Sequence, residues 1–277
     1  MAHKVTSSLR EAVSHSDLVI IVDAGENLED IFFSIRPHLE PGTTVTDTSN
    51  SKVESIRLAH QILPEYCYYV AGRPVPSASQ PMADEPGACA FVGGTYFIVP
   101  SPGPPADALQ SLIGIAELLG AQPLFIDAAE HDSFQIAISY LPMLVASAFT
   151  ALATEHPGWQ DIRRMAGATF NQMVELSLNR QDHIAPRAQL DYDTLQIWLQ
   201  GAIEQLREMS HYISSHQENN QTAALILQRI GEISAQTFAD AQPPQIKGLS
   251  ASSLILGEWL ANRAVKRLIG PPPERTN

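Results

Sequence analysis

Hydrophobic and polar positions alternate along the first part of the chain in a way that predicts strands and helices in turn. Residues 18–22 are apolar on both faces, which is the pattern of a strand buried in a parallel sheet. Further strands are expected at residues 43–46, 67–71, 96–99 and 124–126, and helices at residues 28–39, 52–63 and 106–119. Strands that alternate with helices over short connections predict a doubly wound α/β layout.

Turn and cap residues separate these elements. Residues 72–95 are rich in Pro, Gly and Ser, and we expect them to form a long ordered loop. Gly120 follows the third helical stretch and is suited to its C-cap. Asp127, with Glu130 three residues later, fits the N-cap of a further helix with a capping-box partner.

The pattern changes after Asp127, where helical periodicity replaces strand alternation. Long amphipathic stretches cover residues 192–214 and 221–239, and a final helix is expected at residues 254–268. We therefore predict an α/β domain at residues 1–127, an all-helical domain at 128–270 and a Pro-rich tail at 271–277. Helices with broad apolar faces often bury them against a second subunit, so we expect a homodimer.

Composition and charge narrow the classes of partner. Of 277 residues, 44% are hydrophobic and 17% charged, which is ordinary for a globular protein. The formal net charge of −13 argues against nucleic acid or an anionic membrane as the main partner. A small acidic ligand remains compatible, because a few arginines can dominate the potential inside one pocket.

The cysteines and the chain start bear on the cellular compartment. Cys67 and Cys89 have no metal-ligand spacing, so we expect no metal site, and free thiols in a reducing cytosol are favoured over a disulfide. The first residues lead into a polar stretch and predict no signal peptide. The apolar run at residues 141–153 is shorter than the ~20 residues that span a bilayer. The protein is expected in the cytoplasm.

Several segments carry a family resemblance in one consistent order. Ser-Asp-Leu-Val-Ile-Ile-Val at residues 16–22 is similar to "ADLVILAVP". The segments that resemble "TDVGSTK", G-H-P-M, "GATYVLTP", "EHD…SHLPH" and "GFRDTTRIA" are residues 46–52, 72–75, 94–100, 130–143 and 158–166, respectively. Together these segments, spread over roughly residues 9–240, resemble the prephenate/arogenate dehydrogenase family.

The resemblance implies a fold and an activity. Members of this family have a Rossmann-type domain followed by an all-helical domain that dimerises. They carry out the NAD- or NADP-dependent oxidative decarboxylation of prephenate or arogenate in tyrosine biosynthesis. For this chain the resemblance implies a partial Rossmann-like parallel sheet followed by a helical dimerisation domain.

The chain contains no segment that matches the family's glycine-rich phosphate turn. Gly93-Gly94 precedes a predicted strand rather than a helix, so it does not fit that turn. The family's first strands and their helices are expected to be absent, which makes residues 18–22 an edge strand with apolar side chains. Such an edge promotes aggregation unless it is covered. We expect it to pair across a dimer or to be covered by residues 4–6 or another segment.

Residues at the family's active-site positions differ from the family pattern. Arg73 stands in place of the histidine that takes the substrate's hydroxyl proton, and a guanidinium stays protonated at neutral pH. Tyr140 and Met143 replace the histidines of the S-H-L-P-H motif, and Asn50 replaces the serine of "GSTK". Arg164 matches the arginine that holds a substrate carboxylate, a role that suits its bidentate fork.

Each of these residues also has a structural interpretation. Arg73 could be a surface loop arginine, Arg164 a charge on a helix surface, and Tyr140 a packing residue. The cluster at residues 127–132, whose His131 is the imidazole within a retained motif, is more typical of a helix start than of catalysis.

A predicted strand end supplies further candidates for ligand binding. Asp47 is expected to end its strand and to cap the next helix. Ser49 and Asn50 follow it, and they could face a ligand because such strand ends line the crevice of α/β sheets.

Three functions remain open from the sequence. The first is an NAD(P)-dependent dehydrogenase, impaired or inactive as an isolated chain. The second is a non-catalytic dimeric homologue that binds or senses an aromatic carboxylate, with Arg73 and Arg164 attracting the anion. The third is one half of a split enzyme, with a partner chain that supplies the missing strands.

Overall fold

The computed structural model describes residues 5–22, 27–77, 90–101, 103, 105–178, 191–215, 228, 231 and 232. The chain divides into two units, Met1–Ser214 and Ser215–Asn277. Cys89, the final predicted helix and the Pro-rich tail lie outside the described residues, as does nearly all of the predicted helix at 221–239. The predicted domain boundary near residue 127 stays a prediction, and it falls inside the first unit, where strands give way to helices.

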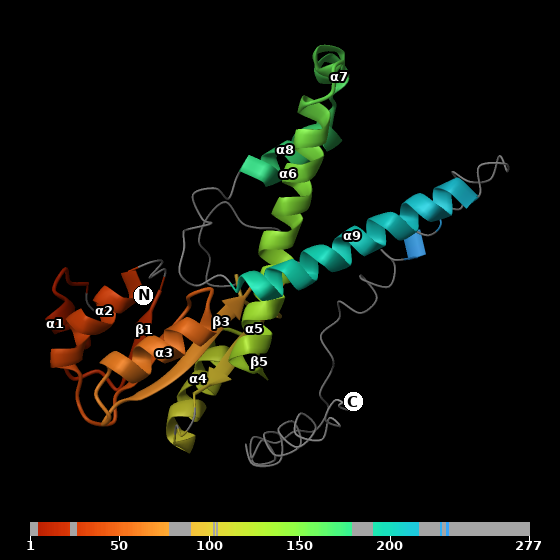
Figure 1. Cartoon of the computed structure of the whole chain (residues 1–277). Coiled ribbons are helices and arrows are strands. Elements are labelled where there is room, and N and C mark those ends of the chain that lie inside the picture. The colour runs from red at the N-terminus through yellow and green to blue at the C-terminus, as the bar shows by residue number, and fades with distance from the viewer. Residues whose placement is uncertain are drawn as a thin grey trace, which may run out of the picture. The chain divides into compact units, whose positions relative to one another are not determined.

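The first unit contains a five-stranded sheet in the order β1-β2-β3-β4-β5 (Figure 1). The strands are β1 (Leu18–Ile21), β2 (Thr44–Asp47), β3 (Tyr68–Val75), β4 (Thr95–Pro100) and β5 (Gln122–Phe125). Strands β1, β2 and β3 are parallel, β4 is antiparallel to β3, and β5 is parallel to β4. The expected Rossmann-like layout is confirmed, but the sheet is mixed rather than wholly parallel.

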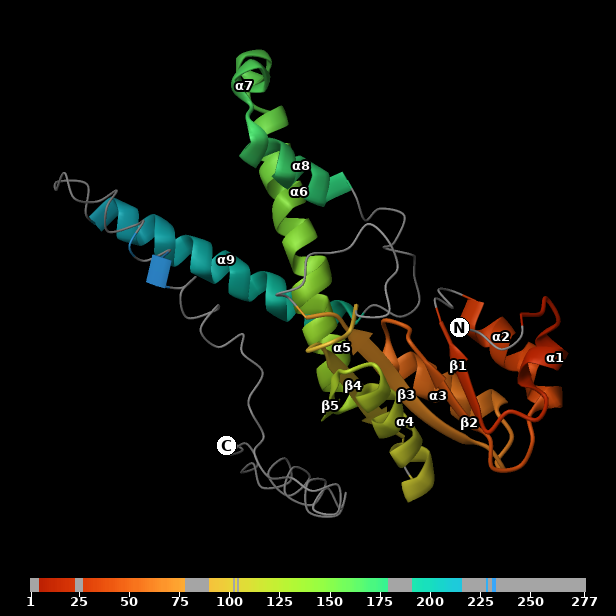
Figure 2. The same ribbon diagram turned by 180° about the vertical axis from the view of Figure 1, so that it is seen from behind.

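Helices cover both faces of the sheet, and among the described residues only helices follow β5. They are α1 (Leu9–Val13), α2 (Leu28–Ile35), the 3₁₀ turn η2 (Arg36–His38), α3 (Lys52–Ile62), α4 (Ala106–Leu118), α5 (Ala128–Gln135), the π-helical turn η3 (Ile136–Tyr140), α6 (Leu141–Thr154), α7 (Trp159–Met165), α8 (Ala168–Leu178) and α9 (Tyr192–Ser215). Figures 1 and 2 show α2 and α3 on one face of the sheet and α4 on the other. Crossovers between parallel strands are generally right-handed, so α4, which joins β4 to β5, is expected on the opposite face because these two strands run opposite to β1–β3.

Two predicted caps are present. Gly120 adopts a φ of +70°, which an L side chain rarely adopts, and the Ala121 N–H returns to the Ala116 carbonyl at 2.9 Å. The Asp127 carboxylate accepts hydrogen bonds from the Ala129 and Glu130 N–H groups at 3.0 and 3.2 Å, and so caps α5. These local signals were readable in the sequence because cap and helix are adjacent in the chain.

The core of the α/β region lies between the sheet and helices α1–α3. Phe32 of α2 and Val45 of β2 are completely buried, and the Phe32 ring meets Tyr69 of β3 edge-on at 5.7 Å between centroids. Val13 of the short helix α1 joins the same cluster. Buried apolar side chains on neighbouring strands and helices thus fix the positions of the strand ends.

Strand β3 is longer than the sequence predicted. Residues 72–75 were expected to begin a loop, but they belong to β3 and pair with β4, with Arg73 opposite Phe97. Pro74 lacks a donor, yet β3 pairs with β2 only through Tyr68 and Tyr69, so this end of the strand has no β2 partner that needs one. The interpretation of Arg73 as a loop residue is therefore wrong.

Residues Ala128–Thr154 form a continuous helix of 27 residues that runs through α5, η3 and α6. Its most apolar 18-residue window has a mean hydropathy of 1.8, and only 17% of that window is buried. By length and composition this helix could cross a membrane, which the apolar run of residues 141–153 alone did not suggest. Exposed apolar surfaces of this kind generally mark a contact with another protein or with a membrane.

Strand β1 is an edge strand within the described part of the sheet, where it pairs with β2 alone. Ile20 and Val22 are 44% and 69% exposed. Val5 does not cover them, because it is itself 88% exposed and outside any strand. The described part of the predicted cover at residues 4–6 is therefore not formed, and pairing across a dimer stays a prediction.

Candidate functional site

The candidate site lies beyond the carboxyl ends of β2 and β3. Asp47 is the last residue of β2, residues 48–51 lead from it into α3, and Arg73 stands near the end of β3. Ligands of open α/β sheets bind at such strand ends, because loops there can present side chains and amides without disturbing the core.

Three of the predicted site residues come together at this place. The Arg73 Nη1 donates a hydrogen bond to the Asn50 Oδ1 at 2.6 Å. Asp47 holds Ser49 in place, because the Ser49 backbone N–H donates a hydrogen bond to the Asp47 Oδ2 at 2.7 Å. Arg73 is half-buried and Asn50 exposed, so the pair stands at the surface of the strand ends.

The glycine before Arg73 has a packing reason. A Cβ on Gly72 would lie 2.7 Å from the hydroxyl oxygen of Tyr96, whose side chain is only 2% exposed and has little room to move. Gly72 thus allows β3 to lie close to Tyr96 of β4. That contact sets the position of the strand segment that carries Arg73.

A buried ionic cluster lies beneath the site. The Lys52 Nζ donates to the Asp47 carboxylate at 3.3 and 3.4 Å and to the Asp47 carbonyl at 3.2 Å, and neither side chain is exposed. The Tyr69 hydroxyl donates to the Asp47 Oδ1. Burial lowers the pKa of Lys52, although Asp47 opposes that shift, and burial together with the Asp47 charge raises the pKa of Tyr69 well above its usual value.

A second carboxylate occupies the N-terminus of α3. Asp132 of α5 accepts hydrogen bonds from the Lys52 N–H at 2.7 Å, the Val53 N–H at 3.0 Å and the Ser51 hydroxyl at 2.9 Å. Asp47 was expected to cap this helix, and that expectation is wrong. Asp47 instead holds Lys52 and the loop, because its side chain points into the buried cluster.

Comparisons with known proteins give the chain its relatives. A family model described as the NAD binding domain of 6-phosphogluconate dehydrogenase matches residues 2–129. A cyclohexadienyl dehydrogenase of Zymomonas mobilis is 22% identical over 216 residues, which cover 77% of this chain and 70% of that protein.

Two solved structures share the fold over both regions. The arogenate dehydrogenase of Synechocystis superposes with a TM-score of 0.64 at 20% identity, over 83% of this chain and 82% of that one. The prephenate dehydrogenase of Aquifex aeolicus, in complex with hydroxyphenyl propionate and NAD⁺, gives 0.57 at 18% identity, over 83% and 80%. The chain shares its fold with these arogenate and prephenate dehydrogenases.

Arg164 lies on α7, far in the sequence from the strand-end cluster. Its side chain is 79% exposed, and its Nη1 lies 3.2 Å from the Asp161 Oδ1 one helical turn earlier. The structure thus gives Arg164 the geometry of a surface pair. A ligand role for it stays a prediction.

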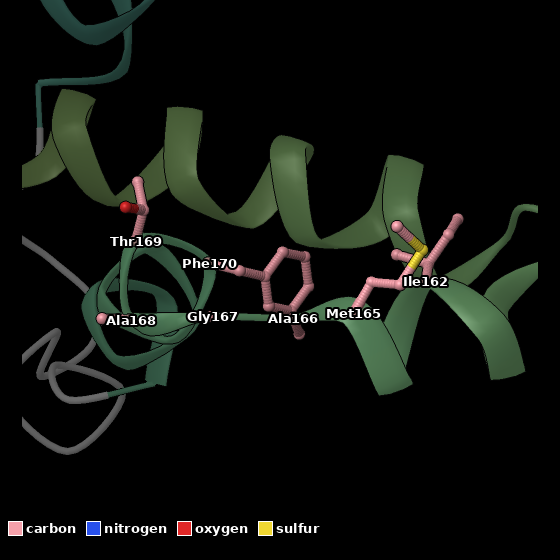
Figure 3. Close-up of a pocket in the computed structure, with 7 residues that line it drawn as sticks. All are labelled: Ile162, Met165, Ala166, Gly167, Ala168, Thr169 and Phe170. Carbon is pink, nitrogen blue, oxygen red and sulfur yellow. The ribbon is translucent and has the colours of Figure 1, made fainter.

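An apolar hollow of about 480 Å³ lies where α7 leads into α8 (Figure 3). It is lined by Ile162, Met165, Ala166, Gly167, Ala168, Thr169 and Phe170. Figure 3 shows the Phe170 ring extending from α8 toward Met165 and Ile162 of α7. The hollow could accept an apolar group, because its lining is mostly apolar.

Tyr140 ends the π-helical turn η3 and is half-buried. Met143, which follows in α6, is buried at 7% exposure. Turns of this type place one extra residue in a helix and are frequent at functional sites. The structure supports packing for Met143, and the role of Tyr140 stays a prediction.

The N-terminus of α3 does not fit a dinucleotide phosphate. Such a phosphate needs free backbone amides at a helix N-terminus. The Lys52 and Val53 amides already donate to Asp132, and Gly93 and Gly94 lead into β4 rather than into a helix. Residues 23–26, between β1 and α2, lie outside the described part of the chain.

Sequence reasoning missed two residues of the site. Lys52 was read only as a helix residue and Asp132 only as part of a helix start, although both lie in segments that resemble family motifs. Their partners are in other elements, and Asp132 is about 80 residues from the amides that it binds. The local sequence gives no signal for this contact, because it offers Ser51 at the N-cap position, and only the structure shows that Ser51 makes no side-chain cap hydrogen bond.

Proposed function

We propose that this chain is a prephenate/arogenate dehydrogenase-like protein that binds an aromatic carboxylate and does not, by itself, carry out the oxidative decarboxylation. The observation that carries this proposal is Arg73, which holds the position of the family's catalytic base and donates to Asn50 at 2.6 Å. A guanidinium is always protonated, so it cannot take a proton from a substrate hydroxyl.

The same arginine supports binding. A guanidinium at a strand end offers several N–H donors in a fork that matches a carboxylate. Asn50 occupies one donor at Nη1. The Asn50 and Arg73 side chains are in direct contact, so the Asn50 amide would lie beside a ligand carboxylate bound to Arg73.

NAD or NADP is the cofactor that family resemblance implies. The Aquifex relative was solved with NAD⁺ and hydroxyphenyl propionate, and the family model that matches residues 2–129 is an NAD-binding domain. The cofactor would supply a hydride acceptor. The described residues of this chain do not fit its phosphates, so the proposal assigns no catalytic step to it.

Three titrations test the proposal on the full chain. We expect hydroxyphenyl propionate to bind in isothermal titration calorimetry, NAD⁺ and NADP⁺ to bind weakly or not at all, and neither prephenate nor arogenate to be turned over. Turnover by the chain alone would overturn the proposal. Arg73→Ala and Arg164→Ala then show which arginine holds the carboxylate: we expect Arg73→Ala to abolish most of the binding.

A second candidate is one half of a split dehydrogenase, and it is favoured by the edge strand β1. The exposed Ile20 lies on this parallel strand and the exposed Val22 directly follows it, and the outer edge of the strand has no partner among the described residues. A partner chain with a parallel strand and a glycine-rich turn would extend the sheet at that edge.

Binding and turnover assays with and without an added partner chain separate this candidate from the first. If a partner completes the enzyme, NAD⁺ binding and turnover should appear only on its addition, and Ile20→Lys should prevent both. Unchanged behaviour of Ile20→Lys in the presence of such a partner would exclude the edge as the docking surface.

A homodimer through the helical region is also part of the proposal. Many large apolar side chains on this region are exposed, namely Ile138, Phe149, Leu152, Met165, Leu176, Leu178, Ile197, Trp198, Leu206, Met209 and Ile213. A second copy would cover this surface in an isologous contact, and the cytoplasm is the compartment that suits such a protein. Light scattering should give twice the chain mass in the absence of detergent, whereas a detergent requirement would favour a membrane.

A further inference from the structure

Asp132 makes contacts that its own helix does not require. It belongs to the second turn of α5, whose N-terminus Asp127 already caps. Its two carboxylate oxygens instead bind Ser51, Lys52 and Val53, at 2.9, 2.7 and 3.0 Å. Asp132 is therefore the N-terminal cap of α3, provided from another helix.

The carboxylate is held in place from behind. The His131 Nδ1 lies 2.9 Å from the Asp132 Oδ1, and the His131 ring is only 5% exposed. That ring also meets Phe97 of β4 edge-on, at 6.1 Å between centroids. Through His131 and Phe97, Asp132 is thus positioned by the sheet as well as by α5.

The loop of the candidate site is fixed at both of its ends. Asp47 accepts from the Ser49 N–H at 2.7 Å on the strand side, and Asp132 accepts from the Ser51 hydroxyl at 2.9 Å on the helix side. Asn50 lies between these two anchors and accepts from Arg73. Release of either anchor would let the Asn50 amide change its orientation.

The residue after Asp132 connects to another helix. Trp198 Nε1 of α9 donates to the Ser133 Oγ at 3.2 Å. Adjacent residues of α5 therefore contact α9 on one side and the site loop on the other.

We propose that Asp132 is the positioning residue of the ligand site: it holds loop 49–51 so that Asn50 and Arg73 face the ligand, and it links that loop to the helical region. This inference rests on the proposed function, in which Arg73 holds an aromatic carboxylate. Its physical basis is preorganisation, since a loop already held in its binding conformation loses less entropy when a ligand arrives.

Asp127 offers a matched control. Asp127 and Asp132 are both aspartates that accept two backbone N–H groups at a helix N-terminus. Asp127 caps its own helix, and among the described residues its side chain accepts hydrogen bonds from α5 rather than from the site loop. Substitution of either residue removes a cap, but only substitution of Asp132 frees loop 49–51.

The experiment compares Asp132→Ala, Asp132→Asn and Asp127→Ala with the wild-type full chain. Calorimetry with hydroxyphenyl propionate measures affinity, amide hydrogen exchange measures the Lys52 and Val53 N–H groups, and thermal unfolding measures stability. We expect both Asp132 variants to bind the probe about tenfold more weakly, or about 1.4 kcal/mol. Exchange at Lys52 and Val53 should be faster, and Asp127→Ala should lose stability with unchanged affinity.

A double-mutant cycle with Asn50→Ala tests whether Asp132 acts through the loop. The loss from Asp132→Asn should shrink when Asn50 is already removed, because coupled residues are non-additive. Equal losses in the two backgrounds, unchanged exchange at Lys52 and Val53, or equal weakening by Asp127→Ala would each overturn the inference. Failure of the wild type to bind the probe would instead overturn the proposed function.

Discussion

The α/β region and the helical region treat their apolar residues in opposite ways. In the α/β region, Phe32, Val45 and Val99 are fully buried between sheet and helices. In the helical region, Ile138 and Leu152 are 70% and 75% exposed, and only Met143 and Ala146 of α6 are buried. The first region has its own core, whereas the second leaves large apolar side chains exposed.

The largest effect should come from the buried ionic cluster of the α/β region. Asp47→Ala leaves the fully buried Lys52 without its carboxylate, and breaking one partner of a buried pair costs about 3–5 kcal/mol. Denaturant unfolding should show this loss. Glu54→Ala is the control: it removes the exposed pair with Arg57, and the transition should hardly move.

The helical region should respond in association rather than in folding. Leu152→Asp places a charge on the exposed apolar face and should raise the dimer dissociation constant about a hundredfold, because a buried leucine contributes about 1.5–3 kcal/mol. Sedimentation at several concentrations measures this. A variant that remains dimeric, or a wild type that is monomeric, would remove the interface from the helical region.

Tyr69→Phe sharpens the picture of the buried cluster. It removes the hydroxyl that donates to Asp47, and a hydrogen bond to a charged group contributes about 1.5–3 kcal/mol. The pKa of Tyr69 is raised in the folded state, so its contribution is complete below the ordinary tyrosine value of 10.0 and declines as pH rises above it. Unfolding measured at pH 8 and pH 11 should therefore show a smaller difference between variant and wild type at pH 11.

The smallest effect concerns the middle of α9. Gly201 lies within this helix with open space around a new Cβ, so Gly201→Ala should stabilise the helix by about 0.5–1 kcal/mol. Thermal unfolding followed by circular dichroism checks the gain. A loss of stability or of dimer would mean that Gly201 packs closely against a second copy.

The sequence predicted those parts of the fold that depend on neighbours in the chain. The strand at Leu18–Ile21, the cap at Asp127 and the glycine at the end of α4 each follow from a few adjacent residues. Loop 72–95 was misread because Pro74 suggests a break, whereas an edge segment of a strand accepts a proline.

Contacts between distant segments could not be derived in the same way. The pairing of β3 with β4 depends on where the chain returns after an intervening stretch, and the Asp132 cap depends on the packing of α5 against α3. Among the candidate site residues, Ser49, Asn50 and Arg73 were found because a strand end brings them together. Lys52 was missed because burial, rather than residue type, determines its role.

The π-helical turn η3 affects how the long helix Ala128–Thr154 can change by insertion or deletion. One additional residue turns everything after it by about 100° around the helix axis. A single codon inserted at this point can therefore keep the side of α5 that meets α3 while it re-aims α6 toward α8. Deletion of one residue from Ile136–Tyr140 would restore a uniform helix and turn the side of α6 that packs against α8 away from that helix.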